Sequence, residues 1–367
     1  MSTYSFPYLS KLAVGYLKAG HSVDVFTCSE TVSQPMSISG GQLTVHVGRR
    51  RVSARERGLD FFRTERADLV ALMEAAAPDV VHAHWLYEFG SAALTYQDDS
   101  LVTAHDSPSA LVRNYKHPYW WFRAGLGLRT IHRLRNLSVV SPSLSTEIPE
   151  SWIRRKNVAL IPNGIDIPSG FTGRPKVGNP PVTFACVANG FDARKNTSSA
   201  IVAFSLARRK LPDSKLLLFG TGHGAGEAAY EWASSRDLCD GVCFIGATTH
   251  EELLAYLGRD VDVLVHTSVW EACSMAILEA QAHGIPVVGG EKSGGVAYTL
   301  AYGSIGLLVD VKDPYSVARA MVDLVSDEKF YSEISRRAVD TMRTRFGFEG
   351  VVDRYLSRLE GILDARH

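Results

Sequence analysis

The sequence predicts an α/β protein made of two parallel-sheet domains. Short apolar runs typical of strands alternate with helical segments along all 367 residues, and this alternation favours parallel sheets covered by helices. The length suits two domains that each bury a core. The segment 167–181 is rich in glycine and proline and divides the chain into two halves of similar design.

Each half contains six strand-like runs, which are short, apolar and bounded by turn residues. Continuous apolar runs of this length are typical of strands that are buried on both faces of a parallel sheet. We expect strands in the first half at 22–27, 43–47, 79–83, 101–104, 137–141 and 157–161, and in the second at 182–188, 214–219, 241–245, 261–266, 285–288 and 306–309.

The composition excludes several classes of protein. Apolar residues make up 46% of the chain, charged residues 21%, and the formal net charge is zero, so bulk charge does not point to nucleic acid. Five cysteines lie mostly within apolar runs, and Cys239 and Cys243 lack a second pair for a zinc site. We find no run of 18 apolar residues and no signal segment. The sequence predicts a cytoplasmic protein with reduced cysteines and no nucleic-acid partner.

The stretch 267–290 carries the clearest chemical pattern. A strand-like run precedes it, a helix is expected over 275–283, and a glycine follows at the position where helices end. Glu271 lies just before this helix and Glu279 lies within it. Eight residues at the helical rise separate the two carboxylates by roughly 12 Å along the axis.

Between the two carboxylates lies the start of the helix. Ser274, Met275 and Ala276 present backbone N–H groups without helical partners, which is a site suited to phosphate. A carboxylate on each side of an anion site suits a ligand made of sugar, diphosphate and ribose. Glu271 would then hold sugar hydroxyls, and Glu279 would hold the ribose hydroxyls.

This pattern, Glu, seven residues, Glu, then Ala-x-Ala-x-Gly-x-Pro-Val-Val, resembles the signature of retaining glycosyltransferases of the GT-B fold, family 4. The resemblance implies two Rossmann-like parallel-sheet domains facing a cleft. It assigns 1–168 to the acceptor-side domain, joined by the C-terminal helix 349–367, and 175–348 to the domain that binds the nucleotide sugar. In this family the two glutamates contact the donor sugar and the ribose, which repeats the roles given above to Glu271 and Glu279.

The beginning of the sequence departs from the family. Residues 12–23 resemble its first helix, a Gly-His turn and its second strand, but the family has an earlier strand and a glycine-rich loop. Only Met1 to Pro7 precede the helix here. The resemblance therefore implies that the first strand is truncated here, and two alternatives stay open: the strand is missing, or the start codon is assigned too late.

Histidines follow two strands of the first half. His105 matches the family's histidine that lies close to the donor sugar, and we predict a catalytic role for it in holding the sugar and stabilising the transition state. His82, His84 and Asp106 lie at similar strand ends. For these three, contact with the acceptor and a purely structural role both stay open.

Cations follow the first strand of the second half. Arg194 and Lys195 stand in a strand-to-helix loop, where they can offset the charge of a diphosphate. Lys195 matches the family's lysine, whereas the family's arginine position falls on Gly190, so Arg194 would replace it from a neighbouring position. Gly220 begins a glycine turn that resembles a donor-binding segment of the family, because glycine allows close backbone approach.

A basic and aromatic segment occupies 113–156. It carries nine lysines and arginines and the run Tyr119 to Phe122. Two interpretations stay open: a solvated helix face with aromatics turned inward, or peripheral contact with the inner face of an anionic membrane or a lipid-diphosphate acceptor.

The function expected from the sequence is that of a retaining glycosyltransferase. It would move a hexose-type sugar from a nucleotide diphosphate sugar to a hydroxyl of a glycan, lipid-linked or small-molecule acceptor, in polysaccharide or glycoconjugate biosynthesis. The resemblance implies no metal and no other cofactor. Two alternatives remain, a nucleotide-sugar epimerase and a non-catalytic glycosyltransferase-like partner subunit.

Overall fold

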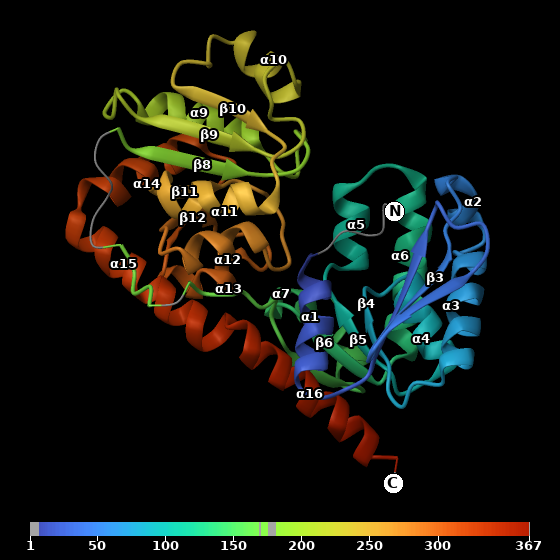
Figure 1. Ribbon diagram of the computed structural model, residues 1–367. Helices are drawn as coiled ribbons and strands as arrows, with labels where there is room; N and C mark the ends of the chain where they lie inside the picture. The colour runs from blue at the N-terminus through green and yellow to red at the C-terminus, as the bar shows by residue number, and fades with distance from the viewer. Residues whose placement is uncertain (1–6, 169, 175–180, 367) are drawn as a thin grey trace. The chain divides into compact units, whose positions relative to one another are not determined.

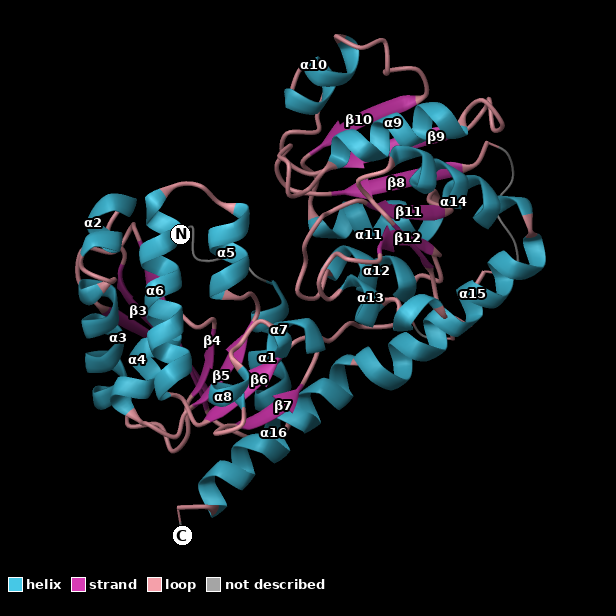
Figure 2. Ribbon diagram, turned by 180° about the vertical axis from the view of Figure 1, so that it is seen from behind, coloured by secondary structure: helices cyan, strands magenta, loops and turns pink. Residues whose placement is uncertain are grey.

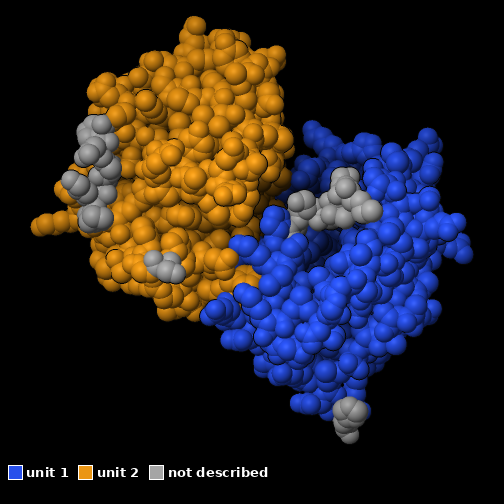
Figure 3. Space-filling view, in the orientation of Figure 1, with its two compact units in different colours: residues 1–164, 349–367 blue, residues 165–348 orange. Residues whose placement is uncertain are grey.

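A computed structural model describes residues 7–168, 170–174 and 181–366 (Figure 1). The chain forms two compact units, one of residues 1–164 with 349–367 and the other of residues 165–348 (Figure 3). The expected linker 167–181 falls partly outside the described residues. Among the described helices, none is long and apolar enough to cross a membrane.

Unit 1 contains two sheets, one mixed and one parallel. The first has the order β1-β3-β2 and the second the order β4-β5-β6-β7. The short strand β2 was not expected from the sequence and pairs antiparallel to β3 at the edge, whereas all other pairs are parallel. The strands are β1 (Val23–Ser29), β2 (Met36–Gly40), β3 (Leu43–Arg49), β4 (His82–His84), β5 (Leu101–Ala104), β6 (Asn136–Val139) and β7 (Asn157–Leu160).

Nine helices are described for unit 1. Prolines occupy the first turn of several of them, where the missing N–H costs nothing. These helices are α1 (Pro7–Lys18), α2 (Ala54–Leu59), α3 (Arg63–Ala76), α4 (Glu88–Tyr96), α5 (Pro108–Asn114), α6 (Pro118–Arg133), α7 (Pro142–Thr146), α8 (Glu150–Ile153) and α16 (Phe348–Asp364).

The C-terminal helix α16 packs on unit 1. The Tyr355 ring lies 4.6 Å from the ring of His82, measured between centroids. Beyond the end of the helix, the Arg366 guanidinium donates to both carboxylate oxygens of Asp99 at 2.7 and 2.8 Å. A bidentate pair of this kind fixes orientation as well as distance.

Unit 2 contains one six-stranded parallel sheet with the order β10-β9-β8-β11-β12-β13 (Figure 2). The strands expected from the sequence are all present within a few residues. They are β8 (Thr183–Val187), β9 (Lys215–Phe219), β10 (Val242–Gly246), β11 (Val263–His266), β12 (Val287–Gly290) and β13 (Leu307–Val309).

Helices cover both faces of this sheet. They are α9 (Thr197–Ala207), α10 (Ala228–Ser234), α11 (His250–Arg259), α12 (Met275–Ala282), α13 (Val296–Thr299), α14 (Pro314–Ser326) and α15 (Glu328–Thr341), followed by a π-helical turn at Met342–Phe346. Phe184 of β8 packs in a core with α9 and α14, whereas its neighbour Ala185 packs in a second core with α11 and α12. Successive strand residues point to opposite faces, so continuous apolar strands are needed here.

The helix α12 ends as the sequence predicts. Gly284 has a φ of +62°, and its N–H donates to the Gln281 carbonyl while the Ile285 N–H donates to the Ala280 carbonyl. This pair of bonds is the Schellman motif, which satisfies carbonyls at the end of a helix. The chain then enters β12 at once, which fixes α12 and Glu279 on the sheet.

Candidate functional site

The sheet of unit 2 changes direction between β8 and β11. From β8 the chain moves outward to β9 on one side, and from β11 it moves outward to β12 on the other. The chain therefore turns to opposite sides of the sheet after the carboxyl ends of these two strands. In open α/β sheets this is where ligands bind. The predicted cations and Glu271 stand on the loops that follow β8 and β11.

Glu271, Lys195 and Arg194 form one charged cluster. Lys195 Nζ lies 2.6 Å and an Arg194 guanidinium nitrogen 3.4 Å from Glu271 Oε1. Burial by itself would raise the pKa of Glu271, but electrostatic interactions with Lys195, His266 and Arg194 and the hydrogen bond from Lys195 more than offset it and lower the pKa. The carboxylate is therefore ionised at neutral pH and can accept hydrogen bonds from hydroxyls.

The loop after β8 is held by its own polar side chains. Asp192 Oδ1 accepts from the N–H groups of Arg194 and Lys195 at 2.9 and 2.8 Å. The Arg194 carbonyl accepts from the Val269 N–H at 2.8 Å, which ties this loop to the one after β11. Asn196 adopts a φ of +52° and donates its side-chain amide to two carbonyls. The side chains of Arg194 and Lys195 are therefore attached to a backbone that hydrogen bonds hold in place.

A glycine makes room for the backbone of Glu271. The Gly295 N–H donates to the Glu271 carbonyl at 2.7 Å, and Glu271 pairs with Gly294 in an isolated parallel bridge. Gly294 has a φ of +64°, and a Cβ there would lie 2.6 Å from the Glu271 carbonyl oxygen. Only glycine fits this contact, so the turn after β12 helps to position the Glu271 side chain.

Glu279 lies inside α12 and is buried. Its Oε1 lies 2.8 Å from Nε2 of His250, the first residue of α11. Ser274 is the N-cap residue of α12, but its side chain makes no capping bond, so Met275 and Ala276 begin the helix without a side-chain cap. The structure places Glu271 and Glu279 on either side of a helix start, which is the arrangement that the sequence predicts.

The glycine turn after β9 approaches the loop after β8. Gly220 has a φ of +107°, and a Cβ there would overlap the Ala188 carbonyl oxygen. Its N–H donates to the Gly246 carbonyl at 2.8 Å. These contacts explain, without any ligand, why glycine is needed at position 220. Contact between Gly220 and the donor stays a prediction.

His105 belongs to unit 1, where it joins a cluster of neutral histidines. Its Nε2 lies 2.9 Å from Nδ1 of His84, and His82 lies between the Tyr16 hydroxyl at 3.0 Å and the Thr103 hydroxyl at 2.7 Å. Burial lowers the pKa of His105 to about 3 and that of His82 to about 3. At neutral pH these rings are uncharged, so they can position or polarise a ligand but hold no extra proton. The donor-sugar role of His105 stays a prediction.

Asp106, which follows His105, accepts a hydrogen bond from the Tyr87 hydroxyl at 2.6 Å. Burial raises the pKa of Asp106 to about 6, although the Tyr87 bond and the Arg123 charge oppose this rise. The contact anchors the loop after β5 to the start of α4.

The basic segment 113–156 is less uniform than the sequence suggests. Arg123 is buried and pairs with Glu88 at 3.1 Å, so this cation of the segment does not belong to an exposed basic face. Helix α6 does expose Trp121 and Leu128 on its outer side, with 59% and 43% of their surface accessible. The segment therefore combines a buried ion pair with an exposed mixed face.

His266 is a residue near the cluster that the sequence analysis does not single out. It ends β11 and is 3% exposed, and within the described chain its Nε2 has no hydrogen-bond partner. Burial lowers its pKa to about 4, while the Glu271 charge opposes this effect. The sequence does contain a signal that could have identified His266, namely a polar residue at the end of an otherwise apolar strand.

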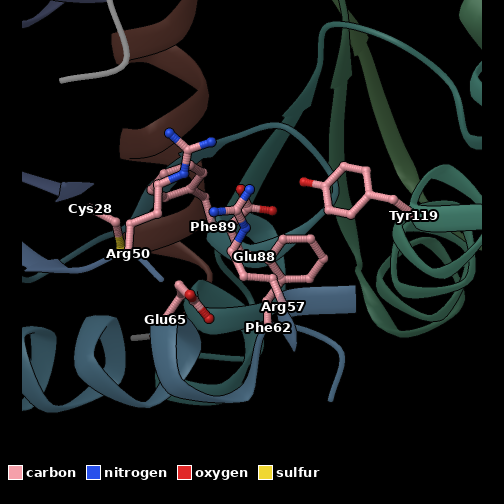
Figure 4. Close-up of a pocket in the computed structure, with 8 residues that line it drawn as sticks. All are labelled: Cys28, Arg50, Arg57, Phe62, Glu65, Glu88, Phe89 and Tyr119. Carbon is pink, nitrogen blue, oxygen red and sulfur yellow. The ribbon is translucent and has the colours of Figure 1, made fainter. Parts of the chain in front are cut away.

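A small cavity in unit 1 is lined by charged and aromatic side chains. Its volume is about 10 Å³, which is room for a single water molecule and not for a sugar. Figure 4 shows its lining: Cys28, Arg50, Arg57, Phe62, Glu65, Glu88, Phe89 and Tyr119. This cavity is no substrate site.

Two family models match consecutive parts of the chain. The model described as "Glycosyltransferase Family 4" matches residues 8–168, and that described as "Glycosyl transferases group 1" matches residues 175–341. Together they cover most of both units.

Curated relatives carry related names. A lipopolysaccharide core biosynthesis glycosyltransferase, LpsE of Rhizobium meliloti, is 27% identical over 273 residues, which are 71% of this chain and 75% of that protein. A D-inositol 3-phosphate glycosyltransferase of Paenarthrobacter aurescens is 25% identical over 390 aligned positions, covering 98% of this chain and 94% of that protein.

Solved structures share the fold. Sucrose-phosphate synthase from Thermosynechococcus elongatus superposes with a TM-score of 0.78 at 19% identity, covering 98% of this chain and 93% of the other. A trehalose-6-phosphate protein of E. coli, bound with UDP-2-fluoro glucose, gives a TM-score of 0.71 at 13% identity, over 98% and 97% of the two chains. With the paired glutamates, the cation loop and the two family matches, the chain belongs to the GT-B glycosyltransferases of family 4.

Proposed function

We propose that this glycosyltransferase is a retaining hexosyltransferase that uses a nucleotide diphosphate sugar. The observation that carries the proposal is the contact of Lys195 and Arg194 with Glu271 at the carboxyl ends of β8 and β11. A diphosphate requires cations and sugar hydroxyls require a hydrogen-bond acceptor, and this cluster brings two cations and a carboxylate together.

In this mechanism the ligand replaces the internal ion pair. The diphosphate takes Lys195 and Arg194, together with the N–H groups at the start of α12, and Glu271 turns to accept sugar hydroxyls. Charge that develops on the departing diphosphate is then stabilised by groups already in place. Electrostatic stabilisation by such preorganised groups is commonly the main source of an enzyme's rate enhancement. No metal ion or further cofactor is part of the proposal.

The anomeric configuration is retained because the acceptor hydroxyl attacks the sugar on the same face from which the diphosphate departs. A phosphate oxygen of the donor takes the acceptor proton, so no protein nucleophile is needed. His105 and Glu271 hold the donor sugar, and His105 does so as a neutral imidazole. In the structure the Glu279 carboxylate contacts His250. In the proposed complex this carboxylate accepts hydrogen bonds from the ribose hydroxyls instead.

The acceptor is a hydroxyl of a glycan, a lipid-linked glycan or a small polyol, in polysaccharide or glycoconjugate assembly. The names of the relatives, a lipopolysaccharide core enzyme and an inositol phosphate enzyme, support this range. A cytoplasmic location suits a nucleotide-sugar donor. Contact with the inner membrane face through 113–156 suits a lipid-linked acceptor, and the exposed Trp121 and Leu128 support it.

Thermal melting of the protein with UDP, GDP, ADP and dTDP tests the donor class. We expect one nucleotide to raise the melting temperature and Glu279→Ala to abolish that shift. If none of the four nucleotides raises the melting temperature, the non-catalytic partner subunit is favoured. The anomeric configuration of the product, read by NMR from the matching sugar nucleotide, tests retention, and a free epimer without acceptor would favour the epimerase.

Sedimentation with lipid vesicles tests the membrane contact. Vesicles with anionic lipid are expected to bind the protein, neutral vesicles to bind it less, and Trp121→Ser to weaken binding at unchanged melting temperature. Equal behaviour of Trp121→Ser and the unaltered protein would leave the solvated-face interpretation.

A further inference from the structure

His266 stands at the end of β11, on the face of the sheet that α12 covers. Leu264, two residues earlier, packs in the core with α11 and α12, whereas Val265 packs in the core with α9 and α14. Side chains along a strand alternate between the two faces, so His266 shares the face of Leu264. The imidazole therefore lies on the same side of the sheet as α12.

The ring of His266 has one nitrogen without a partner. The residue is 3% exposed, and in the described part of the chain its Nε2 makes no hydrogen bond. An unpaired polar atom in the interior costs free energy that an apolar side chain would not cost. A second state of the protein, in which Nε2 has a partner, would explain why a histidine stands here.

The charged cluster acts on this ring. Burial is the main reason that the pKa of His266 lies at about 4; the charge of Glu271 raises this pKa, and the charges of Lys195 and Arg194 lower it. His266 acts in turn on the carboxylate of Glu271. The imidazole is therefore neutral while the two cations are paired with Glu271.

Donor binding, as proposed above, changes the charges around the ring. In the free protein Lys195 and Arg194 both contact the same oxygen of Glu271. A diphosphate that takes these two cations removes both partners of that oxygen and adds negative charge to the cluster. Of the three side chains whose charges lower the pKa of Glu271, His266 is then the one left to pair with it.

We propose that His266 takes up a proton from solvent when the donor binds, and that its Nε2–H then donates to the Glu271 carboxylate. This inference rests on the proposed use of a nucleotide sugar. One proton is added to the imidazole, and no covalent bond to the ligand forms. The new ion pair holds Glu271 while its other oxygen accepts the sugar hydroxyls. His266 is thus a positioning residue, because it acts through Glu271.

The remaining titratable groups on this face have partners of their own or are absent. Glu279 of α12 contacts His250 of α11, and β12 has the sequence Val-Val-Gly-Gly. The cluster therefore sets the direction of the effect. A diphosphate neutralises the two cations, so the pKa of His266 rises from about 4 on binding. The complex holds more protons than the free protein between that pH and the new pKa.

Calorimetry of nucleotide binding measures this proton. The probe is whichever of UDP, GDP, ADP and dTDP raises the melting temperature, titrated at pH 6.5 in buffers of different ionisation enthalpy. If the ion pair restores an ordinary histidine pKa of about 6.5, about half a proton is taken up by His266 per bound nucleotide. Protons exchanged by the phosphate itself are common to all variants, so the difference between variants reports the histidine.

The variants identify the group that takes up the proton. His266→Gln and His266→Asn should bind the nucleotide without this uptake, and Glu271→Gln, which cannot form the ion pair, should lose it as well. Uptake that is kept in the His266 variants and lost in His250→Gln overturns the proposal. Full uptake in Glu271→Gln overturns it too.

NMR of isotope-labelled histidine rings tests the unaltered protein, so this measurement does not depend on the folding of a variant. We expect one buried ring to pass from the neutral to the protonated form when the nucleotide is added. Rings that all keep their protonation state overturn the proposal.

The rate of sugar transfer gives an independent readout. His266→Leu is expected to lower kcat about tenfold or more at a similar KM for the donor, because Glu271 is then poorly held. His266→Gln keeps a hydrogen-bond donor and should recover part of that loss. Equal kcat in His266→Leu and the unaltered protein overturns the proposal.

The two levels of the argument fail in different ways. A protein that binds none of the four nucleotides contradicts the proposed function, and the role of His266 with it. Nucleotide binding without proton uptake overturns the role of His266 alone.

Discussion

Lys195 Nζ lies 2.6 Å from Glu271 Oε1, although 76 positions separate the two residues in the chain. Their loops follow β8 and β11, which are neighbours in the sheet of unit 2. The contact holds opposite charges where a diphosphate sugar would be bound. An ion pair that a ligand can replace keeps both groups charged and oriented before the ligand arrives.

Replacing Glu271 should separate nucleotide binding from sugar transfer. Glu271→Gln keeps the shape but removes the charge that competes for Lys195, so we expect an unchanged or lower Kd for the nucleoside diphosphate. Loss of the contact to the sugar should lower kcat on the order of a hundredfold. Calorimetry and initial rates measure the two effects, with Glu231→Gln on the exposed face of α10 as control.

Removing either cation should act on the diphosphate. Lys195→Ala is expected to raise the Kd of the nucleoside diphosphate about tenfold or more, because a charge-assisted bond is lost, while the weak affinity for the nucleoside alone stays unchanged. Arg194→Ala should have a smaller effect of the same kind. Exposed Lys210→Ala is the matched control, and an equal loss of nucleoside affinity would contradict a diphosphate role.

The buried histidines should make unit 1 sensitive to acid. Burial lowers the pKa values of His82 and His105 to about 3, whereas in the unfolded chain each takes up a proton near pH 6.5. Stability from the neutral rings is complete above that pH and falls as the pH drops toward 3, by up to about 1.4 kcal/mol per pH unit for each histidine.

The change in unfolding free energy with pH is measured by urea unfolding between pH 7.5 and 5, with amide exchange in β4 and β5 as the readout. His82→Gln is expected to reduce it, since glutamine keeps hydrogen-bonding groups but does not titrate. His21→Gln, at an exposed position, should leave the slope unchanged. A slope that stays the same in His82→Gln would show that other groups cause the acid sensitivity.

Gly220 should tolerate no side chain. Gly220→Ala places a Cβ against the Ala188 carbonyl at a φ of +107°, so we expect destabilisation on the order of 3 kcal/mol. Gly361→Ala in α16 meets open space and should be neutral or stabilising by about 1 kcal/mol. Denaturant midpoints of the two variants give the comparison, and similar midpoints would contradict the close approach.

Activity should not depend on a divalent metal ion. The proposal gives the charge of the leaving group to Lys195, Arg194 and the start of α12, so a chelator is expected to leave the rate of sugar transfer unchanged. Initial rates with and without chelator, and with added magnesium, measure this. Loss of activity that magnesium restores would assign part of that charge to a metal ion.

The sequence alone determined the local structure of unit 2 and the residues of its charged cluster. Continuous apolar runs are required of strands buried on both faces, and so they marked β8 to β13 correctly. Gly284 marked the end of α12, because few other residues adopt its φ. Glu271, Lys195 and Arg194 were found because their spacing from these elements is local in the chain.

Only the tertiary structure decided which distant groups meet. The bond of Glu279 to His250, the position of His266 beside the charged cluster, and the buried pair of Arg123 with Glu88 all depend on neighbouring elements far apart in sequence. Pairing between strands is a property of sheet order, and sheet order is set by packing that no single stretch of sequence contains.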